Sequence, residues 1–318
     1  MRIGIMGCGG IAKVFAQAVH QVGGITLAAA AKDQARAEAF AKDNGAVAAY
    51  GSYEAMVQEE KLDAVYIATT HNSHYELIEL CLNHQIAVLC EKPMVLTEAQ
   101  AQALFDLAKE KDTLLVEAMW TKMQKSFLMA KEWVEAGRIG QVRLVETSFG
   151  SHVPFNPTNR FYNPDLAGGA MYDLGVYNLQ FTCGILSTQP EEVTGSAIVG
   201  TTGVDESSLI TMRFPNGVLG LGVCSFHVTT DHKAVIYGEK GKIVVSHFYA
   251  CRKISLQDTS GQEIDTYEVE EVNGFVYQVR HFVQLLKENK KESDLVTPAD
   301  TIGCAKIFDT LNRQWGIS

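Results

Sequence analysis

The sequence predicts an α/β protein in which a doubly wound parallel sheet is followed by an α+β domain with a large, mainly antiparallel sheet. In the first third of the chain, short apolar runs alternate with segments of helical periodicity, which is the pattern of a parallel sheet covered on both faces. A glycine-rich turn follows the first of these runs. After about residue 120, alternating strand-like segments separated by turn residues replace this rhythm, which is typical of antiparallel hairpins.

The first part of the chain reads as strand and helix in turn. Strands are expected over residues 3–6, 25–31, 64–69, 87–90 and 114–118, and helices over residues 11–22, 35–44, 53–60, 74–83 and 98–111. The strands read as continuous apolar runs because a parallel sheet buries both of its faces. This alternation predicts the doubly wound arrangement.

The rest of the chain favours an antiparallel sheet. Strands are expected over residues 141–149, 193–199, 207–213, 218–228, 233–237 and 243–247, and helices over residues 126–135, 275–288 and 298–313. The tripeptides Pro215-Asn216-Gly217 and Glu239-Lys240-Gly241 supply turns between neighbouring strands. We therefore expect two domains, 1–120 and 121–318, with the C-terminal helix able to pack back on the first.

Composition excludes several classes of function. The chain has 318 residues, 47% of them hydrophobic and 20% charged, and a net charge of -10. Such an acidic surface repels phosphate backbones, so nucleic-acid binding is not expected. The first residues enter a strand pattern at once and no apolar run reaches membrane length, so we expect neither a signal peptide nor a membrane span.

Cysteine and histidine usage predicts a reducing compartment and no metal. The seven cysteines form no C-x-x-C pair, and several lie in apolar runs, so we expect buried free thiols in the cytoplasm. His71-x-x-His74 has a loose metal-like spacing without a cysteine or carboxylate in register. We therefore interpret it as a strand-end turn and helix start, not as a metal site.

The glycine-rich turn Gly7-Cys8-Gly9-Gly10-Ile11-Ala12 lies between the first strand and the first helix. In such a turn the first glycine permits the tight bend, and the second lets the backbone approach a pyrophosphate. The third position, alanine here, lets the helix pack on the strand. Free N–H groups of the helix N-terminus then face the phosphates, so the turn predicts dinucleotide binding.

The end of the second strand bears on which dinucleotide is bound. An acidic residue there would bind the ribose 2′-hydroxyl of NAD, but this chain has Ala31-Lys32-Asp33. Ala31 leaves space and Lys32 supplies a cation, which favours the 2′-phosphate of NADP. Two alternatives stay open, because Lys32 could be a solvated loop lysine and Asp33 could reach a ribose, so use of NAD as well is expected.

Glu91-Lys92-Pro93 follows a buried strand, at the sheet edge where ligands of open α/β sheets bind. A lysine there can hydrogen-bond a substrate hydroxyl or lower the pKa of a neighbouring acid/base group. An ordinary charged pair in a surface loop is the alternative.

Gly168-Gly169 precedes an apolar helical segment that contains Asp173 and Tyr177. A spacing of four residues places both side chains on the same helix face. A carboxylate and a phenol are costly to bury without partners. They form either a structural hydrogen bond or a catalytic pair that faces a nicotinamide.

Taken together, these segments resemble the glucose–fructose oxidoreductase/inositol dehydrogenase (Gfo/Idh/MocA) family over essentially the whole chain. The matching segments are Gly7–Ala12, Ala68–His74, Glu91-Lys92-Pro93 and Asp173–Tyr177. Glu117-Ala118-Met119-Trp120-Thr121-Lys122 and Gly168–Phe181 are most similar to the dimeric dihydrodiol dehydrogenase and D-xylose dehydrogenase branch. That branch usually has an arginine in place of Lys122, and a lysine cannot reproduce its planar, bidentate contacts.

The resemblance implies a Rossmann domain that binds NAD(P) and a second domain whose open sheet forms a homodimer or a higher homo-oligomer. It implies that Lys92, Asp173 and Tyr177 flank a sugar, polyol or dihydrodiol substrate. Together with the turn chemistry, it implies a set of cofactor contacts. These are Gly7, Gly9, Gly10, Ile11, Ala12, Ala31, Lys32, Thr69, His71, His74, Glu91, Lys92 and Trp120.

The expected activity is reversible hydride transfer between a secondary alcohol or cyclic hemiacetal and nicotinamide. Tyr177 would take the hydroxyl proton, Lys92 would stabilise the developing negative charge, and Asp173 would orient one of them or bind a sugar hydroxyl. Because an unperturbed tyrosine has a pKa near ~10, it needs such help at neutral pH. Two alternatives on the same fold are a non-catalytic NAD(P)-binding regulator and an NAD-dependent glycoside hydrolase.

Overall fold

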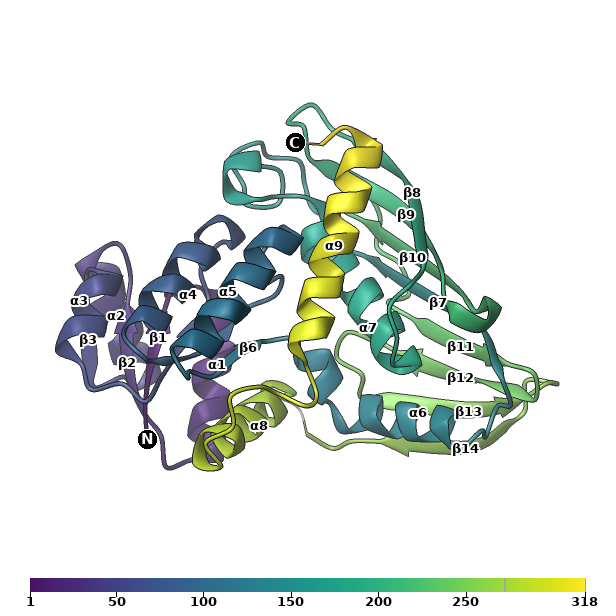
Figure 1. Ribbon diagram of the computed structural model, residues 1–318, viewed down its shortest axis with the longest axis horizontal. Helices are drawn as coiled ribbons and strands as arrows, with labels where there is room; N and C mark the ends of the chain where they lie inside the picture. The colour runs from purple at the N-terminus through teal and green to yellow at the C-terminus, as the bar shows by residue number, and fades with distance from the viewer. Residues whose placement is uncertain (272, 318) are drawn as a thin grey trace. The chain divides into compact units, whose positions relative to one another are not determined.

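A computed structural model describes residues 1–271 and 273–317 of the chain. The backbone forms two compact units, each with its own sheet (Figure 1). The first unit contains Met1–Val95, Ala99–Ala118 and Asn273–Thr301. The second contains residues 96–98, 119–271 and 302–317. No helix in these described ranges combines the length and the apolar composition needed to cross a membrane.

The first unit is built on a six-stranded sheet in the order β3-β2-β1-β4-β5-β6, and all of its strand pairs are parallel. Its strands are β1 (Arg2–Met6), β2 (Thr26–Ala30), β3 (Ala48–Tyr50), β4 (Ala64–Ile67), β5 (Ala87–Cys90) and β6 (Leu115–Glu117). The strand order reverses between β1 and β4, and ligands of such sheets bind outside the carboxyl ends of the strands at that point. The predicted doubly wound parallel sheet is confirmed.

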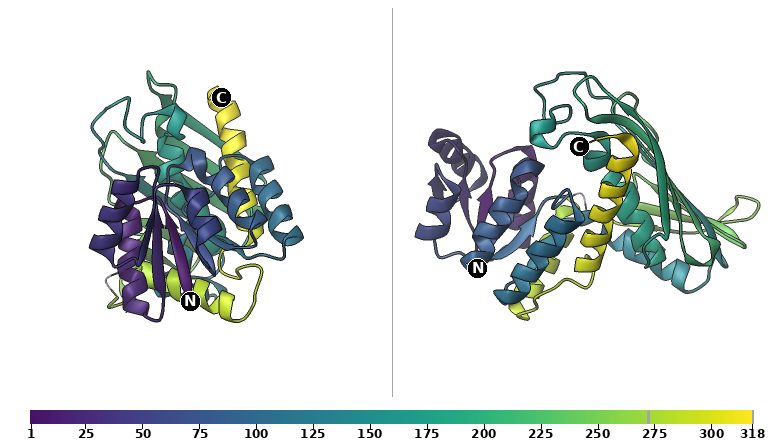
Figure 2. Two further views of the ribbon diagram at one scale, coloured as in Figure 1. Left: turned by 90° about the vertical axis from the view of Figure 1, so that its left-hand side faces the viewer. Right: turned by 45° about the horizontal axis from the view of Figure 1, so that its top comes forward.

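Helices cover both faces of this sheet, as the left view of Figure 2 shows. They are α1 (Gly10–Val22), α2 (Gln34–Asn44), α3 (Tyr53–Glu59), α4 (His74–Asn83), α5 (Glu98–Glu110) and α8 (Phe275–Lys287). Apart from Arg2 at the start of β1, the central strands β1, β4 and β5 are consequently apolar or small, with Ile5, Tyr66 and Leu89 fully buried. This two-sided burial is the physical reason that the strands could be recognised as unbroken apolar runs.

One strand of this sheet, β3, was not predicted. Its sequence, Ala48-Ala49-Tyr50, is short and only half-buried. It contains no β-branched residue, so neither its composition nor its periodicity distinguishes it from a loop. Pairing with β2 creates the strand, and that long-range contact is not visible in the local sequence.

A late segment of the chain belongs to the first unit. α8 packs against α1, and Asn273 Nδ2 donates a hydrogen bond to the carbonyl oxygen of Val14 at 3.2 Å. The apolar face of α8, with Phe275, Val279 and Phe282 buried, accounts for this return. The predicted domain ranges are 1–120 and 121–318, and they stay a prediction. The compact units differ from them because Asn273–Thr301 belongs to the first unit.

The second unit is built on an eight-stranded sheet in the order β14-β13-β12-β11-β7-β10-β9-β8. Its strands are β7 (Val142–Gly150), β8 (Glu192–Val199), β9 (Asp205–Arg213), β10 (Leu219–Ser225), β11 (Ala234–Gly238), β12 (Gly241–Ser246), β13 (Lys253–Asp258) and β14 (Glu263–Glu268). The pair β7–β10 is parallel, and the other pairs are antiparallel. The mainly antiparallel sheet is confirmed, and both predicted hairpins, β9–β10 and β11–β12, are present.

Two strands of the second sheet, β13 and β14, were not predicted. β14 lies at the sheet edge and has no fully buried residue, and its charged residues are typical of a protected edge strand. In β13 the buried Ile254 and Leu256 stand among polar residues. Neither strand therefore shows the apolar signal on which strand prediction depends.

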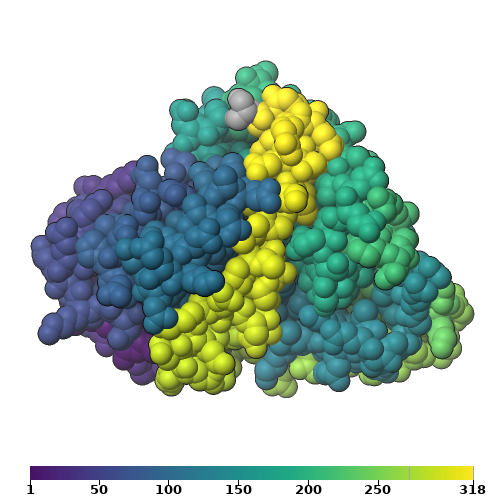
Figure 3. Space-filling view, viewed as in Figure 1, coloured from purple at the N-terminus to yellow at the C-terminus, as the bar shows by residue number. Residues whose placement is uncertain are grey.

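Helices α6 (Lys125–Glu135), α7 (Val176–Leu186) and the later part of α9 (Pro298–Trp315) lie on one face of this sheet (Figures 1 and 2). α7 is buried from Val176 to Ile185. The end of α9 lies at the surface in the space-filling view (Figure 3), and Trp315 Nε1 donates to the carbonyl oxygen of Gly195 in β8 at 3.0 Å. The opposite sheet face exposes apolar side chains such as Leu209 and Leu219.

Candidate active site

The glycine-rich turn connects the carboxyl end of β1 to the first residue of α1. Gly7 has φ +96°, and a Cβ there would lie 2.7 Å from the carbonyl oxygen of Ala68. Only glycine fits such a position, because side chains rarely adopt this φ and the neighbouring atom is rigid backbone. Gly7 N also donates to the carbonyl oxygen of Ala30 at 3.0 Å. The turn is therefore fixed between the ends of β2 and β4.

The start of α1 suits a phosphate group. A Cβ at Gly9 or Gly10 would meet nothing within 4 Å, and Gly9 precedes the helix without a side-chain cap bond. Backbone N–H groups at the helix start can therefore approach an anion closely. Ala12 is fully buried and Ile11 is 39% exposed, so the small residue lets α1 pack on the sheet. The predicted turn residues thus fit a dinucleotide pyrophosphate.

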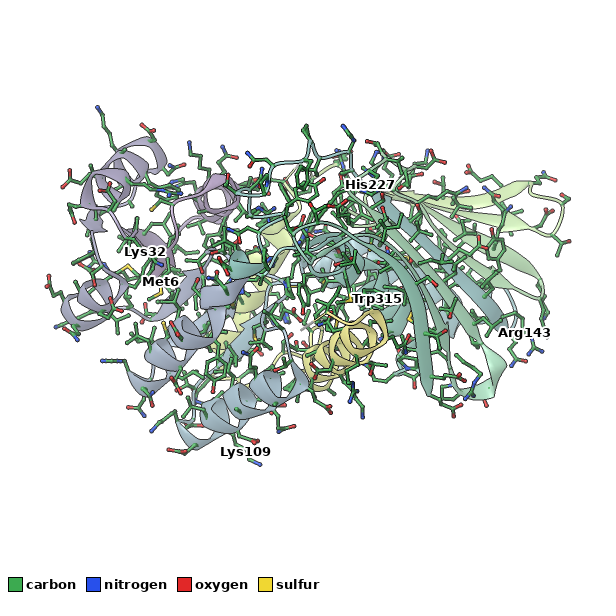
Figure 4. The ribbon with its side chains drawn as sticks, turned by 90° about the horizontal axis from the view of Figure 1, so that it is seen from above. Met6, Lys32, Lys109, Arg143, His227 and Trp315 are labelled. Carbon is green, nitrogen blue, oxygen red and sulfur yellow. The ribbon has the colours of Figure 1, made fainter. Side chains whose placement is uncertain are left out.

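The segment after β2 contains two cationic side chains, Lys32 and Arg36, and one carboxylate, Asp33, that is engaged in a helix-capping hydrogen bond. Ala31 is buried and Lys32 is exposed, next to the end of β1 at Met6 (Figure 4). Asp33 Oδ1 accepts a hydrogen bond from Arg36 N at 2.8 Å and so caps α2. The Arg36 guanidinium donates from Nη2 to the carbonyl oxygen of Cys8 at 3.4 Å, which places it beside the glycine-rich turn.

Arg36 was not among the predicted contacts. The sequence offered one signal, a capping aspartate followed three residues later by an arginine in the first turn of a helix. That pattern is common, and only the fold brings this guanidinium next to the turn that follows β1.

The predicted contacts between Thr69 and His74 form the connection from β4 to α4. His71 lies in a short 3-10 helix, and His74 is the fully buried first residue of α4. His74 Nδ1 lies 3.0 Å from the carbonyl oxygen of Pro93, and its Nε2 lies 3.3 Å from that of Thr69. Burial lowers the pKa of His74 to about 4. The neutral ring thus joins the loops that follow β4 and β5, and its contact with a cofactor stays a prediction.

Buried carboxylates hold the backbone on both sides of Lys92. The Tyr66 hydroxyl donates to Glu91 Oε1, and Lys92 N donates to Glu91 Oε2 at 3.3 Å. Beyond the cis Lys92–Pro93 bond, Met94 N donates to Glu117 Oε1 at 3.0 Å. Burial raises the pKa of Glu91. Lys92 therefore stands on a fixed segment at the carboxyl end of β5, and the surface-loop alternative does not apply.

The segment with Asp173 and Tyr177 is not a regular α-helix. Met171–Gly175 is π-helical, and α7 begins at Val176. We expected a regular helix here, and the structure has a π-helical turn, which contains more residues than an α-helical one; that Asp173 and Tyr177 share one face stays a prediction. Asp173 Oδ1 forms an ion pair with Arg160 Nη1 at 3.2 Å. Single π-turns occur frequently at functional sites.

Aromatic side chains surround Tyr177. Trp120 Nε1 donates a hydrogen bond to the Tyr177 hydroxyl oxygen at 3.1 Å. The rings of Phe149 and Tyr249 lie with their centroids 5.4 and 6.1 Å from that of Tyr177. Phe149 and Tyr249 were not predicted, because an aromatic residue in a strand or loop has no signal that separates it from ordinary core. Trp120 is half-buried, and its contact with a cofactor stays a prediction.

Lys122 occupies a different environment from Tyr177. It is 5% exposed, and a Cβ at Gly184 would lie 3.0 Å from its Cε. Its aliphatic chain therefore packs on the side of α7 where Gly184 leaves room.

Across the described ranges 1–271 and 273–317, no group of histidine, cysteine, aspartate and glutamate side chains has the arrangement of a metal site.

The chain thus combines a parallel sheet of the dinucleotide-binding type with a second sheet that supports a buried tyrosine. The family model for the NAD-binding Rossmann-fold oxidoreductase family (GFO/IDH/MocA) matches residues 1–118. The model for the GFO/IDH/MocA C-terminal domain matches residues 127–244. The chain belongs to the Gfo/Idh/MocA family of NAD(P)-dependent oxidoreductases.

Known relatives cover the full chain. Trans-1,2-dihydrobenzene-1,2-diol dehydrogenase of Mus musculus is 30% identical, covering 100% of this chain and 98% of that protein. The Danio rerio enzyme of the same name is 29% identical, with 100% and 97% covered. Among solved structures, a 3-ketoreductase from Actinomadura kijaniata in complex with NADP superimposes with TM-score 0.89 at 20% identity, covering 98% of this chain and 97% of that chain. Levoglucosan dehydrogenase in complex with NADH gives TM-score 0.89 at 18% identity, with 99% and 97% covered.

Proposed function

We propose that this protein is a dehydrogenase that oxidises a secondary alcohol on a ring, with Tyr177 as the acid/base residue. The observation on which this proposal rests is the hydrogen bond from Trp120 Nε1 to the Tyr177 hydroxyl oxygen. A donor directed at a phenolic oxygen stabilises its deprotonated form. Tyrosine needs such stabilisation to act as a base near neutral pH.

Three side chains share the chemistry. Tyr177 accepts the proton of the substrate hydroxyl. Lys92, on its fixed segment, stabilises the negative charge that develops on the phenolate or on the alkoxide. Asp173, paired with Arg160, orients a neighbour or accepts a hydrogen bond from a second substrate hydroxyl. A nicotinamide cofactor held at the glycine-rich turn Gly7–Ala12 would supply the acceptor for the hydride of the carbinol carbon.

We propose that the substrate is a dihydrodiol or a related cyclic polyol or sugar. The half-buried rings of Trp120 and Tyr249 near Tyr177 provide apolar surfaces on which a planar or ring-shaped substrate can pack. The names of the mouse and zebrafish relatives point to the same class.

A substrate screen tests this proposal. Dihydrodiols, aldopyranoses and inositols are each incubated with NAD and with NADP, and the reduced cofactor is measured. Net reduction with at least one cyclic alcohol supports the dehydrogenase. Sugar release without net reduction would indicate an NAD-dependent glycoside hydrolase, and cofactor binding without turnover would indicate a regulator.

The proposed cofactor preference is NADP. Asp33 is engaged in capping α2, whereas Lys32 and Arg36 place two cations at the end of β2. Arginine and lysine are the usual partners of a phosphate group. Of the expected contacts, these two would bind the 2′-phosphate, while the glycine turn would bind the pyrophosphate of either cofactor.

Substitution of the two cations should lower NADP use selectively. A charged hydrogen bond contributes about 1.5–3 kcal/mol, so Arg36→Ala and Lys32→Ala should each raise the KM for NADP about 10- to 100-fold. The KM for NAD should change little. Lys42→Ala, at an exposed position in the last turn of α2, is the matched control. Equal effects on both cofactors would contradict the assignment.

We propose that the protein is a homodimer that pairs through the second sheet. The face opposite α6 and α7 exposes Leu209 at 45% and Leu219 at 52%. Exposed apolar side chains on one sheet face often mark protein interfaces. Leu209→Lys should shift the molar mass in light scattering from dimer to monomer. Val47→Lys, at an equally apolar position in the first unit that is 63% exposed, should leave it unchanged. A wild-type monomer would contradict the proposal.

We also propose that the protein functions in the cytoplasm. All seven cysteines are free and buried. Burial raises the pKa of Cys8 to about 11 and that of Cys81 to about 12, so these thiols are protonated and unreactive. Such thiols are typical of a reducing compartment.

A further inference from the structure

Asp205 is a buried carboxylate that the proposed chemistry does not use. It begins β9, is 2% exposed, and accepts a hydrogen bond at Oδ2 from Met171 N at 2.8 Å. Met171 is the first residue of the π-helical turn, so its N–H has no partner within the helix. The carboxylate therefore fixes the beginning of the segment that contains Asp173 and Tyr177.

The paired glycines before this segment leave room for two neighbours, the Asp205 carboxylate at Gly169 and the backbone of Phe161 at Gly168. Gly169 has φ +129°, and a Cβ there would lie 2.5 Å from Asp205 Oδ1. A Cβ at Gly168 would lie 2.7 Å from the carbonyl oxygen of Phe161. Asp205 thus lies in space that only a glycine at position 169 leaves free. These two contacts explain why glycine stands at both positions 168 and 169.

The next strand supports the same segment further along. A Cβ at Gly175 would lie 3.2 Å from Cys224 Sγ, so this residue packs closely on β10. Asn178 Nδ2 donates to the carbonyl oxygen of Val223 at 2.9 Å. β9 and β10 therefore hold the backbone on both sides of Tyr177, and Asp205 is the charged member of this support.

Ionisation of Asp205 costs free energy because the carboxylate is buried. Burial raises its pKa to about 7, and Glu206 on the same strand adds to the effect. Of the groups that face it from neighbouring elements, Tyr172 on the π-helical turn has its pKa raised to about 12 by burial, and burial also raises the pKa of Cys224 on β10. Tyr172 and Cys224 are thus neutral near pH 7 and add no second negative charge beside Asp205.

We propose that Asp205 is a positioning residue for the acid/base segment: its carboxylate holds the Met171 amide and so sets the π-helical turn that places Asp173 and Tyr177. The inference rests on the proposed function, because it assigns the segment a catalytic purpose. It adds Asp205, a residue of strand β9 that lies 34 positions beyond its partner Met171 in the sequence.

The kinetic test uses Asp205→Asn, which keeps the shape of the side chain and removes the charge. We expect kcat to fall about 10- to 100-fold, because a small displacement of an acid/base group has effects of that order. NADPH affinity, measured by fluorescence, should stay unchanged, since the glycine-rich turn belongs to the first unit. Glu192→Gln, an exposed carboxylate at the start of the neighbouring strand β8 that pairs with Arg213, is the matched control and should retain wild-type kcat.

The pH dependence separates positioning from simple stabilisation. Below about pH 7 Asp205 is protonated and accepts the Met171 hydrogen bond more weakly. The kcat of the wild type should therefore decrease as the pH is lowered through about 7, and the pH–rate profile of Asp205→Asn should lack this decrease. Because the folded pKa is raised, the folded state binds this proton more tightly, and its stability falls as pH rises through about 7. At about pH 8 the Tm of Asp205→Asn should therefore equal or exceed that of the wild type.

A measurement on the unmodified protein covers the case in which Asp205→Asn does not fold. Hydrogen exchange, corrected for intrinsic rates, should show lower protection of the peptide 170–177 at about pH 8 than at about pH 6, because an opening that hydrates Asp205 relieves the cost of its buried charge. Equal protection at both values would overturn the proposal, as would wild-type kcat and pH profile in Asp205→Asn. An inactive wild type would refute the proposed function instead, while the exchange experiment would still decide the role of Asp205.

Discussion

Replacement of Tyr177 by phenylalanine is expected to lower kcat for alcohol oxidation by about two to four orders of magnitude, the usual contribution of a positioned acid/base group. The phenyl ring preserves packing against Phe149 and Tyr249 but lacks the oxygen to which we assign the substrate proton. Cofactor affinity should not change, because the cofactor turn lies in the first unit. Steady-state kinetics with NADPH titration by fluorescence measures both quantities.

Tyr172→Phe is the matched control for this experiment. Tyr172 lies in the same helical segment, and its hydroxyl accepts a hydrogen bond from Asn312 Nδ2 at 2.7 Å. Loss of that bond should reduce the free energy of unfolding by about 1 kcal/mol and leave kcat nearly unchanged. Near-normal turnover in Tyr177→Phe, or an equal loss in Tyr172→Phe, would remove Tyr177 from the acid/base role.

Replacement of Lys92 by alanine is expected to have the second-largest effect, with a loss of about two orders of magnitude in kcat/KM. An ammonium near a phenol favours the phenolate and shifts its pKa by about 1–3 units. Removal of that charge should therefore displace the rising limb of the pH–rate profile for alcohol oxidation upward by a similar amount.

Two further variants distinguish charge from shape at this position. Lys92→Arg keeps the charge and should retain the position of the limb, although its kcat falls because the planar head differs in shape. Lys109→Ala, at an exposed position in the last turn of α5 (Figure 4), should leave the profile unchanged. An unshifted limb in Lys92→Ala would contradict electrostatic support by Lys92.

Much of the fold could be predicted because its signals are local. The central parallel strands are apolar on both faces, and the turn at Gly7 lies between a strand and a helix as its glycine pattern requires. The strands β3, β13 and β14 were missed because pairing, not residue type, creates them. The same reasoning explains why α8 could be recognised as a helix while its packing on α1 could not be foreseen.

The candidate site could be predicted only where a motif places a residue at the end of an element. Lys92 and the pair Asp173 and Tyr177 are of this kind. Arg36 and Asp205 were missed because their significance depends on partners 28 and 34 positions away. The π-helical turn was missed as well, because no residue type marks it and its geometry depends on packing against β9 and β10.

The central claim is that this protein transfers a hydride from a ring alcohol to nicotinamide. A cyclic diol or polyol that the screen identifies as a substrate is prepared with deuterium at the carbinol carbon and incubated with NADP. Mass spectrometry of the reduced cofactor measures the transfer directly. The account predicts one deuterium in each reduced cofactor molecule formed. Reduced cofactor without deuterium, or product formation without any reduced cofactor, would contradict it.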